Sequence, residues 1–376
     1  MKKVFIKTFG CQMNERDSEI IAGLLKRKGY KLVKSHKQAD VIIVNTCSVR
    51  QHAEDKVWSQ LGVYKDKIIG VVGCMARNYK EKIFERAENV SFVVGPQDID
   101  KIPEIIRKVQ VARGKSQGKA LYEIRIWETD SENRPDEIYH TGFCSSKNHA
   151  FVIISEGCSN YCAYCVVPYV RGALRHRTHE NILKEINQAV KNGITSITLL
   201  GQNVNSYKSG HMDFTGLLSR INAIKGLKEF EFMTSHPKDT NIKLFQAIRR
   251  LEKLKKQLHL PLQSGSNKIL KKMNRGYTRE GFMGLVKDYR KIVPGGLLST
   301  DIIVGFPGES EVDFKHTLEL VKAVRFNAAY LFKYSPRPNT AAEKLPDDVT
   351  REAKESRHKK LLDLQKKVCA GLAKKR

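Results

Sequence analysis

Short apolar runs that alternate with amphipathic stretches set the organisation expected for the first third of the chain. Four such runs predict buried strands: residues 4–9, 41–44, 68–72 and 91–94. Between the first two runs, Ile20, Ile21, Leu24 and Leu25 recur at helical spacing and stop before Gly29. Strands that alternate with helices favour a parallel, doubly wound sheet. We therefore expect an N-terminal α/β domain over residues 1–111.

The same alternation returns after residue 148. Strands are predicted over six ranges: 151–154, 197–200, 229–233, 258–262, 299–304 and 328–332. Helices are predicted between them over five ranges: 180–192, 215–224, 242–255, 278–292 and 311–324. These six β/α units are fewer than the eight of a closed barrel. A second α/β domain is therefore expected over residues 148–345.

Two segments fall outside this alternation. Residues 112–147 are expected to form a connector, since 114–118 is rich in turn residues and 128–137 is acidic and nearly free of apolar side chains. The run Leu121 to Trp127 predicts one further strand within it. Residues 346–376 are expected to form a basic helix, over Arg351 to Lys375.

Three thiols lie within eight residues, at Cys158, Cys162 and Cys165. Three cysteines on one loop suit a [4Fe–4S] cube and leave its fourth iron open to a small molecule. The usual four-cysteine zinc patterns need a second C-x2-C pair, which the chain lacks. A structural zinc knuckle and free thiols are the alternative interpretations.

Three further cysteines follow predicted strands of the first domain. Cys11, Cys47 and Cys74 each stand two or three residues past the end of a strand. Because the carboxyl ends of parallel strands share one edge, where ligands bind, these thiols are expected to converge on a second metal cluster. The alternative is three unrelated core cysteines, since free cysteine is often buried. Cys144 and Cys369 lie outside both triads and are expected to be spare thiols.

The composition limits the chemical class of partner that the chain can be expected to bind. Among 376 residues, 67 are Lys or Arg and 40 are Asp or Glu, which gives a net charge of +27 and favours a polyanionic partner. No apolar stretch is long enough to span a membrane, and the N-terminus lacks the apolar run of a signal peptide. A cytoplasmic protein without a membrane partner is therefore expected, and its eight cysteines favour metal ligands over disulfides.

Polar residues gather where the predicted strands of the second domain end. Gln202 follows one strand, and Asp301 lies within an otherwise apolar one, so it is expected to face the lumen and to need a partner. A barrel-filling salt bridge, for which an arginine is one candidate partner, is the structural alternative for Asp301. His236 and His259 are candidate proton relays, with satisfied core or rim histidines as the other interpretation.

The cysteine loop Cys158-Ser159-Asn160-Tyr161-Cys162-Ala163-Tyr164-Cys165 resembles the signature of the radical S-adenosylmethionine (SAM) enzymes. The resemblance implies that the unique iron chelates SAM, which is cleaved to a 5′-deoxyadenosyl radical. Tyr164 occupies the place of an aromatic that shields the cluster, and Gln202 and Asp301 are expected to contribute to SAM binding. The six predicted β/α units match the open (β/α)6 barrel of that superfamily.

The first domain resembles the methylthiotransferases at three segments: Thr8 to Ser18, Asn45 to Arg50 and Val72 to Met75. In that family such cysteines bind an auxiliary [4Fe–4S] cluster, here implied at Cys11, Cys47 and Cys74. Gln12-Met13-Asn14 is similar to the branch that acts on tRNA. The implied reaction adds a methylthio group to C2 of N6-isopentenyladenosine at position 37, beside the tRNA anticodon.

Several points remain open at this stage. The same chemistry on N6-threonylcarbamoyladenosine 37 or on a ribosomal-protein aspartate, and an iron–sulfur RNA-binding sensor without turnover, are the alternatives. Implied partners are the tRNA anticodon loop and an electron donor such as flavodoxin or ferredoxin, with an unidentified sulfur donor and a monomeric chain. No catalytic acid or base is identified. Family members normally end in a small β-barrel RNA-binding domain, and the sequence after residue 346 predicts none.

Overall fold

The computed structural model describes residues 2–48, 51–115 and 125–373. The chain divides into two compact units. Unit 1 comprises Met1–Ile153, Val166–Ala173 and Lys191–Gly193. Unit 2 comprises Ile154–Cys165, Leu174–Val190 and Ile194–Arg376. The domain boundaries expected from the sequence stay a prediction.

Unit 1 is built on a six-stranded parallel sheet in the order β2-β1-β3-β4-β5-β6. The strands are β1 (Lys3–Thr8), β2 (Lys31–Leu32), β3 (Val41–Thr46), β4 (Ile68–Gly73), β5 (Phe92–Val94) and β6 (Ile126–Glu128). All residues of β3 and β4 are buried, as expected for central strands covered on both faces. The parallel, doubly wound sheet predicted from the sequence is confirmed.

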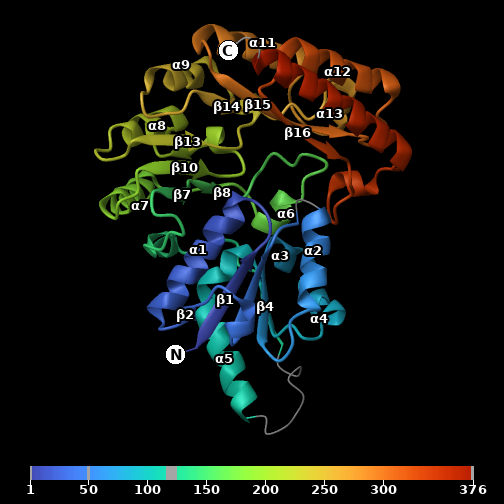
Figure 1. Ribbon diagram of the computed structural model, residues 1–376. Helices are drawn as coiled ribbons and strands as arrows, with labels where there is room; N and C mark the ends of the chain where they lie inside the picture. Colours follow the sequence, from blue (N-terminus) through green and yellow to red (C-terminus); the bar gives the residue numbers. More distant parts are fainter. Residues whose placement is uncertain (1, 49–50, 116–124, 374–376) are drawn as a thin grey trace. The chain divides into compact units, whose positions relative to one another are not determined.

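Helices cover both faces of this sheet (Figure 1). Its helices are α1 (Gln12–Arg27), α2 (Gln51–Leu61), α3 (Cys74–Tyr79), α4 (Lys82–Arg86) and α5 (Ile102–Lys115). Figure 1 shows α1 and α5 on one face and α2 and α4 on the other. Ile42, Val44, Val57 and Phe84 belong to one buried apolar cluster between the sheet and the second helix layer.

The expected connector contributes to the structure of unit 1. Its strand β6 pairs with β5, in the register Phe92 to Ile126, and extends the sheet by one strand. The sequence predicted this strand over Leu121 to Trp127, of which residues 121–124 lie outside the described part of the chain. Arg134, in the acidic run, is 3% exposed because it forms a buried ion pair with α1.

In the second half of the chain, six strands recur with helices between them. They are β7 (His149–Ile153), β10 (Ser196–Leu200), β13 (Glu229–Phe232), β14 (Gln257–His259), β15 (Leu297–Val304) and β16 (Ala328–Lys333). Within unit 2, β10 pairs in parallel with β13, and β15 pairs in parallel with β14 and β16. Along β15, even-numbered residues from Leu298 are buried and odd-numbered ones are partly exposed, as in a strand with one covered face.

The helices of this half follow the predicted ranges closely. They are α6 (Val167–Arg171), α7 (His179–Lys191), α8 (Phe214–Asn222), α9 (Ile242–Arg250), α10 (Asn267–Lys272), α11 (Arg279–Ile292), α12 (Glu311–Val324) and α13 (Arg351–Ala373). Helix α9 ends five residues earlier than expected, because Leu254 forms a β-bridge with Phe230 and Lys256 donates to the Leu251 carbonyl. Two short antiparallel pairs are also present: β8 (Ser155–Glu156) with β9 (Arg175–His176), and β11 (Lys208–Ser209) with β12 (Met212–Asp213).

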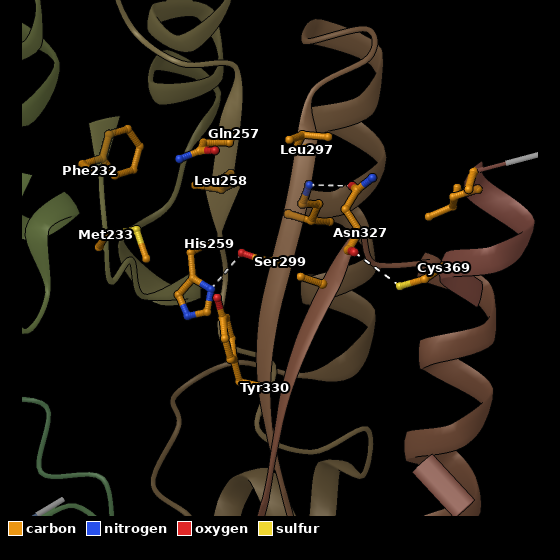
Figure 2. A pocket seen from close by; sticks show the side chains of 14 residues that line it. Phe232, Met233, Gln257, Leu258, His259, Leu297, Ser299, Asn327, Tyr330 and Cys369 are labelled. Carbon is orange, nitrogen blue, oxygen red and sulfur yellow. Dashed lines mark hydrogen bonds between the residues drawn. The ribbon is translucent and has the colours of Figure 1, made fainter. Parts of the chain in front are cut away.

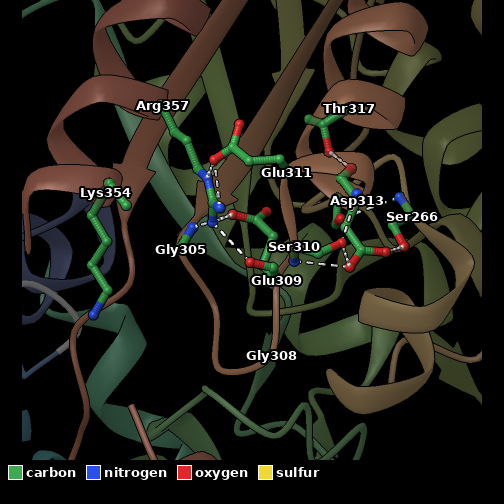
Figure 3. A network of polar contacts seen from close by, with 12 residues as sticks. Ser266, Gly305, Gly308, Glu309, Ser310, Glu311, Asp313, Thr317, Lys354 and Arg357 are labelled. Atoms are coloured by element: carbon green, nitrogen blue, oxygen red, sulfur yellow. Dashed lines mark hydrogen bonds and ion pairs between the residues drawn. The ribbon is translucent and has the colours of Figure 1, made fainter. Parts of the chain in front are cut away.

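The last helix, α13, packs onto unit 2 through a mixed stripe of buried residues. Leu361 is fully buried, and the Gln365 amide donates to the Phe326 carbonyl at 2.9 Å. Figure 3 shows Arg357 reaching from α13 to Glu309, at 3.0 Å, and to Glu311, at 2.7 Å. This arginine therefore ties the terminal helix to the loop that follows β15. The prediction of a helix to Lys375 extends past the described residues, which end at residue 373.

Candidate functional site

The loop with Cys158, Cys162 and Cys165 turns sharply at two points. Gly157 has φ of 67° and Tyr161 has φ of 46°, in the left-handed region that a residue with a side chain adopts only under constraint. Cys162 is buried, and Cys158 and Cys165 are partly exposed. Burial raises the pKa of the Cys158 thiol.

A second segment, residues 273–277, holds this loop in place. The Ala163 amide donates to the Met273 carbonyl at 2.9 Å, and the Asn274 side chain donates to the Tyr161 carbonyl at 3.0 Å. Asn274 itself has φ of 57°, so the segment turns directly after α10. The constrained backbone at Tyr161 is therefore fixed by contacts from a part of the chain more than a hundred residues away.

Arg275 lies in that segment and contacts the cysteine loop directly. Its Nη1 donates to Cys162 Sγ at 3.2 Å and to the Tyr164 hydroxyl at 3.3 Å. Its Nε donates to the Tyr277 hydroxyl at 3.0 Å, and Tyr277 donates in turn to the Leu262 carbonyl at 2.9 Å. Burial raises the pKa of Tyr164 well above its usual value, so its hydroxyl stays protonated beside the guanidinium.

Several buried polar atoms near the strand ends of unit 2 have no hydrogen-bond partner among the described residues. They belong to Ser155 Oγ, Gln202 Oε1, Asn203 Oδ1, Ser235 Oγ, His236 Nε2 and Gln263 Oε1. A buried polar group without a hydrogen bond is costly, and such groups are found at ligand sites. Thr234 and Gln263 also have positive φ there, at 71° and 65°. This set suits SAM, which offers amino, carboxylate, ribose and adenine groups.

The four polar residues predicted as site candidates in the second domain have different surroundings. Gln202 has the unpartnered carbonyl oxygen just described, and Asp301 Oδ2 lies 3.3 Å from His259 Nε2, not beside an arginine. The partner of Asp301 is thus a histidine and not the arginine suggested for the salt bridge, and the role of Asp301 in SAM binding stays a prediction. Burial lowers the pKa of His236 to about 2, which makes it a neutral ring. The Lys238 amide donates to His236 Nδ1 at 3.1 Å, so the ring proton is on Nε2 and points to no protein acceptor.

A cavity of about 560 Å³ lies beside the His259–Asp301 pair (Figure 2). Figure 2 shows His259 bonded to Ser299 of β15, and Cys369 of α13 bonded to Asn327, the residue before β16. Leu297, Leu298 and Ala328, at the amino ends of these strands, form part of its wall. In parallel strands the amino ends are opposite the carboxyl ends, so this cavity is not the strand-end site.

The second triad lies along the carboxyl edge of the sheet of unit 1. Cys11 precedes α1, and Cys47 and Cys74 come directly after β3 and β4, nearer the strand ends than the sequence indicated. Gly10 packs so closely that a Cβ there would lie 2.7 Å from Cys47 Cβ. Burial raises the pKa of the Cys74 thiol, and the charge of Cys11 adds to this effect. The three cysteines are thus brought to one edge, as predicted.

A buried amide network fixes the turns that carry these cysteines. The Asn14 side chain donates to Asn45 Oδ1 at 3.0 Å and to the Thr46 carbonyl at 2.8 Å. The Asn45 side chain donates to the Asn14 carbonyl at 2.8 Å. Cys11 Sγ donates to Asn14 Oδ1 at 3.3 Å. Asn14 therefore links the first cysteine turn to the second, which gives a physical reason for the asparagine three residues after Cys11.

A buried ion-pair network adjoins Cys74. Asp17, 1% exposed, accepts from Arg134 and from Arg171, each at 2.8 Å. Burial favours a raised pKa for Asp17, but the two guanidinium groups outweigh it and the pKa is lowered. The charge of Arg171 opposes the effect of burial on the Cys74 thiol, whose pKa is raised overall. The Nη1 of Arg171 is buried and has no partner among the described residues.

The donor sets fit iron–sulfur clusters. Each triad offers three thiols next to a buried arginine, and thiolates are the ligands of such clusters. No group of three His, Cys, Asp or Glu residues in the described part of the chain matches a site for a single metal ion. A cube of iron and sulfide spreads its ligands further apart than one ion does, so this finding bears on single ions only.

Two site residues were missed by sequence reasoning. Neither Arg275 nor Arg171 was singled out as a site residue. Charged residues are mostly exposed, so no pattern in the sequence indicates that these two are about 4% exposed. The one available signal was the turn sequence Asn274-Arg275-Gly276, where Gly276 has φ of 65°.

The two remaining cysteines have protein partners. Cys144 Sγ donates to the His149 carbonyl at 3.0 Å, and burial raises the pKa of its thiol. Cys369 Sγ donates to the Asn327 carbonyl at 3.4 Å and accepts from the Gln365 amide at 3.2 Å. Their assignment as non-ligands stays a prediction.

Comparison with known proteins identifies two family models and many relatives. Residues 3–95 match the model described as Uncharacterized protein family UPF0004, and residues 152–321 match the Radical SAM superfamily. A Moorella thermoacetica protein named tRNA-2-methylthio-N(6)-dimethylallyladenosine synthase is 43% identical over 98% of this chain and 83% of its own length. A Clostridium botulinum protein of the same name is 46% identical over 95% of this chain and 79% of its own length.

Solved structures support the fold. The radical S-adenosylmethionine methyltransferase TsrM from Kitasatospora setae matches with a TM-score of 0.61 and 12% identity, over 91% of this chain and 77% of that one. The radical enzyme OxsB matches with a TM-score of 0.56 over 99% of this chain and 56% of that one. No helix of the described residues has the length and apolar character needed to cross a membrane. With these matches, the chain belongs to the tRNA-2-methylthio-N(6)-dimethylallyladenosine synthase family of the radical SAM superfamily.

Proposed function

We propose that this chain adds a methylthio group to C2 of N6-isopentenyladenosine at position 37 of tRNA, giving 2-methylthio-N6-isopentenyladenosine. The proposal rests on one observation above the others. Two separate cysteine triads, one in each unit, each have a buried arginine beside one of their thiols. The names of the relatives and the matched family models agree with this chemistry.

The reaction explains why such sites are needed. C2 of an adenine has neither an acidic proton nor a leaving group, so acid–base side chains alone offer no route to substitution. SAM and two [4Fe–4S] clusters, when bound, supply radical chemistry and a methyl group that no side chain provides. In this proposal Cys158, Cys162 and Cys165 hold one cluster, and Cys11, Cys47 and Cys74 hold the auxiliary one.

The side chains of this chain would bind SAM, cover the first cluster and balance the charge of the thiolates. The unpartnered atoms of Gln202, Ser235 and His236 would bind polar groups of SAM, since each lacks a protein partner and is buried. Tyr164 would cover the first cluster, held by Arg275 at 3.3 Å. Arg171 would balance the charge of thiolates at the second triad.

The partners follow from charge and chemistry. A net charge of +27 favours tRNA as the substrate, and reading position 37 requires its base to leave the anticodon-loop stack. A low-potential donor such as flavodoxin or ferredoxin would supply electrons. A monomeric, cytoplasmic enzyme is proposed, and the sulfur donor is left unassigned.

Mass spectrometry of tRNA nucleosides tests the proposal. A strain that lacks the gene should accumulate isopentenyladenosine and lose its 2-methylthio form, and the intact gene should restore it. Variants in which either triad is replaced by alanine should fail to restore it. Loss of methylthio-threonylcarbamoyladenosine instead would contradict the proposed substrate. An unchanged nucleoside profile, together with no 5′-deoxyadenosine from SAM and dithionite, would favour the non-enzymatic sensor.

A further inference from the structure

Arg275 is a buried cation that lacks the usual counter-ion. Its side chain is 4% exposed, and its hydrogen-bond partners are Cys162 Sγ, the hydroxyls of Tyr164 and Tyr277, and the Pro261 carbonyl at 3.4 Å. Among the described residues, no carboxylate lies within ion-pair distance of its guanidinium. A buried charge without an opposite charge is strongly unfavourable, so its surroundings must contain an anion.

The possible anions at this position are few. The other hydrogen-bonding side chains, Tyr164 and Tyr277, are phenols, which are neutral at physiological pH. A carbonyl oxygen carries no charge. Cys162 is therefore the one partner that can become an anion, as a thiolate ligand of an iron–sulfur cluster.

The guanidinium is also held rigidly toward that sulfur. Its Nε is bonded to the Tyr277 hydroxyl at 3.0 Å, and Tyr277 is anchored on the carbonyls of Pro261 and Leu262, at 3.0 and 2.9 Å. Nη1 is thereby aimed at Cys162 and Tyr164 from a fixed base. Such a group can change the properties of a cluster without being one of its ligands.

We propose that Arg275 is a positioning residue that raises the reduction potential of the cluster held by Cys158, Cys162 and Cys165. This inference rests on the proposed function. Reduction transfers one electron from a low-potential one-electron donor, such as reduced flavodoxin or ferredoxin, to the cluster, and no proton moves. The cluster becomes more negative, so a fixed positive charge and a hydrogen bond to its sulfur favour the reduced form.

Redox titration of three variants tests the proposal. Full-length Arg275→Met, Arg275→Lys and Arg279→Met would be reconstituted anaerobically and titrated, following the electron paramagnetic resonance signal that changes when SAM is added. Arg279→Met is the matched control, because it removes the same charge four residues away. The ion-pair partners of Arg279 are partly exposed carboxylates. Iron content and thermal unfolding would be measured on the same samples.

The midpoint potential should shift to more negative values in Arg275→Met. It should shift less in Arg275→Lys, because lysine keeps the charge but not the forked geometry. It should stay at the parent value in Arg279→Met. A merely structural role would lower iron content or stability and leave the potential of the retained cluster unchanged, which would overturn the proposal. If Arg275→Met fails to fold, an unchanged potential in Arg275→Lys and Tyr277→Phe together would also overturn it. A parent protein without a SAM-sensitive signal would refute the proposed function as well.

Discussion

Removing the Asp17 charge should destabilise unit 1 strongly. Asp17 joins Arg134 and Arg171, each at 2.8 Å, and the three side chains are at most 3% exposed. Breaking a buried ion pair by removing one partner costs about 3–5 kcal/mol, because the remaining charge is left unpaired. Asp17→Asn keeps an oxygen that still accepts from one arginine, so a loss of about 3 kcal/mol is expected.

The assay can be restricted to unit 1. The chain has two tryptophans, Trp58 and Trp127, and both lie in that unit. Trp58 is in contact with Arg86, whose guanidinium lies 4.2 Å from its ring, so its fluorescence should change on unfolding. Denaturant unfolding followed at these tryptophans should report the free energy of unit 1. A loss of about 3 kcal/mol corresponds to a melting temperature roughly 6–12 °C lower for a unit of this size.

The pH dependence gives a second test. Since the folded-state pKa of Asp17 is below 3.8, its contribution to stability is present above pH 3.8 and is lost as the pH falls further. The difference between parent and Asp17→Asn should therefore shrink below pH 3.8. Asp130→Asn is the matched control, because Asp130 pairs with Lys80 at 3.0 Å but is 70% exposed, and its effect should stay within about 0.5 kcal/mol. Equal small losses for both variants would refute the buried network.

Three further changes have defined outcomes. Asp313→Ala removes the capping box of α12, in which Ser310 and Asp313 bond each other's backbone, and should lower thermal stability by about 1 kcal/mol; an unchanged melting temperature would contradict the cap. Replacing Cys144 and Cys369 by Ser should leave iron content and turnover at parent values, whereas loss of one cluster would show a misassigned triad. The exposed lysines of α13 are Lys359, Lys360, Lys366 and Lys367. Replacing them by Gln should weaken tRNA binding and reduce the slope of log affinity against log salt by roughly 0.7–0.9 for each lost phosphate contact. An unchanged slope would mean that α13 does not touch RNA.

The sequence predicted the fold and the positions of both cysteine triads because these features are local or periodic. Apolar runs of strand length locate the strands, and in a parallel sheet the residues after them meet at one edge. Cys11, Cys47 and Cys74 therefore could be placed together without coordinates. The burial of the middle strands also followed from their uninterrupted apolar runs.

The residues that neutralise and orient the triads could not be predicted in the same way. Arg134 meets Asp17 across 117 positions of sequence, and Arg275 meets Cys162 across 113. Whether such an arginine is exposed or buried depends on contacts between distant segments, which a single sequence does not encode as a period. Asp301 illustrates the same limit, since its need for a partner was evident but the identity of that partner, His259, was not.

Iron content tests the central claim, that each triad holds its own cluster. After anaerobic reconstitution the parent chain should bind about eight irons, four for each cube. The variant with Cys158, Cys162 and Cys165 replaced by Ala should keep about half, and so should the variant with Cys11, Cys47 and Cys74 replaced. Loss of all iron in either variant, or full retention in either, would contradict the two-site account.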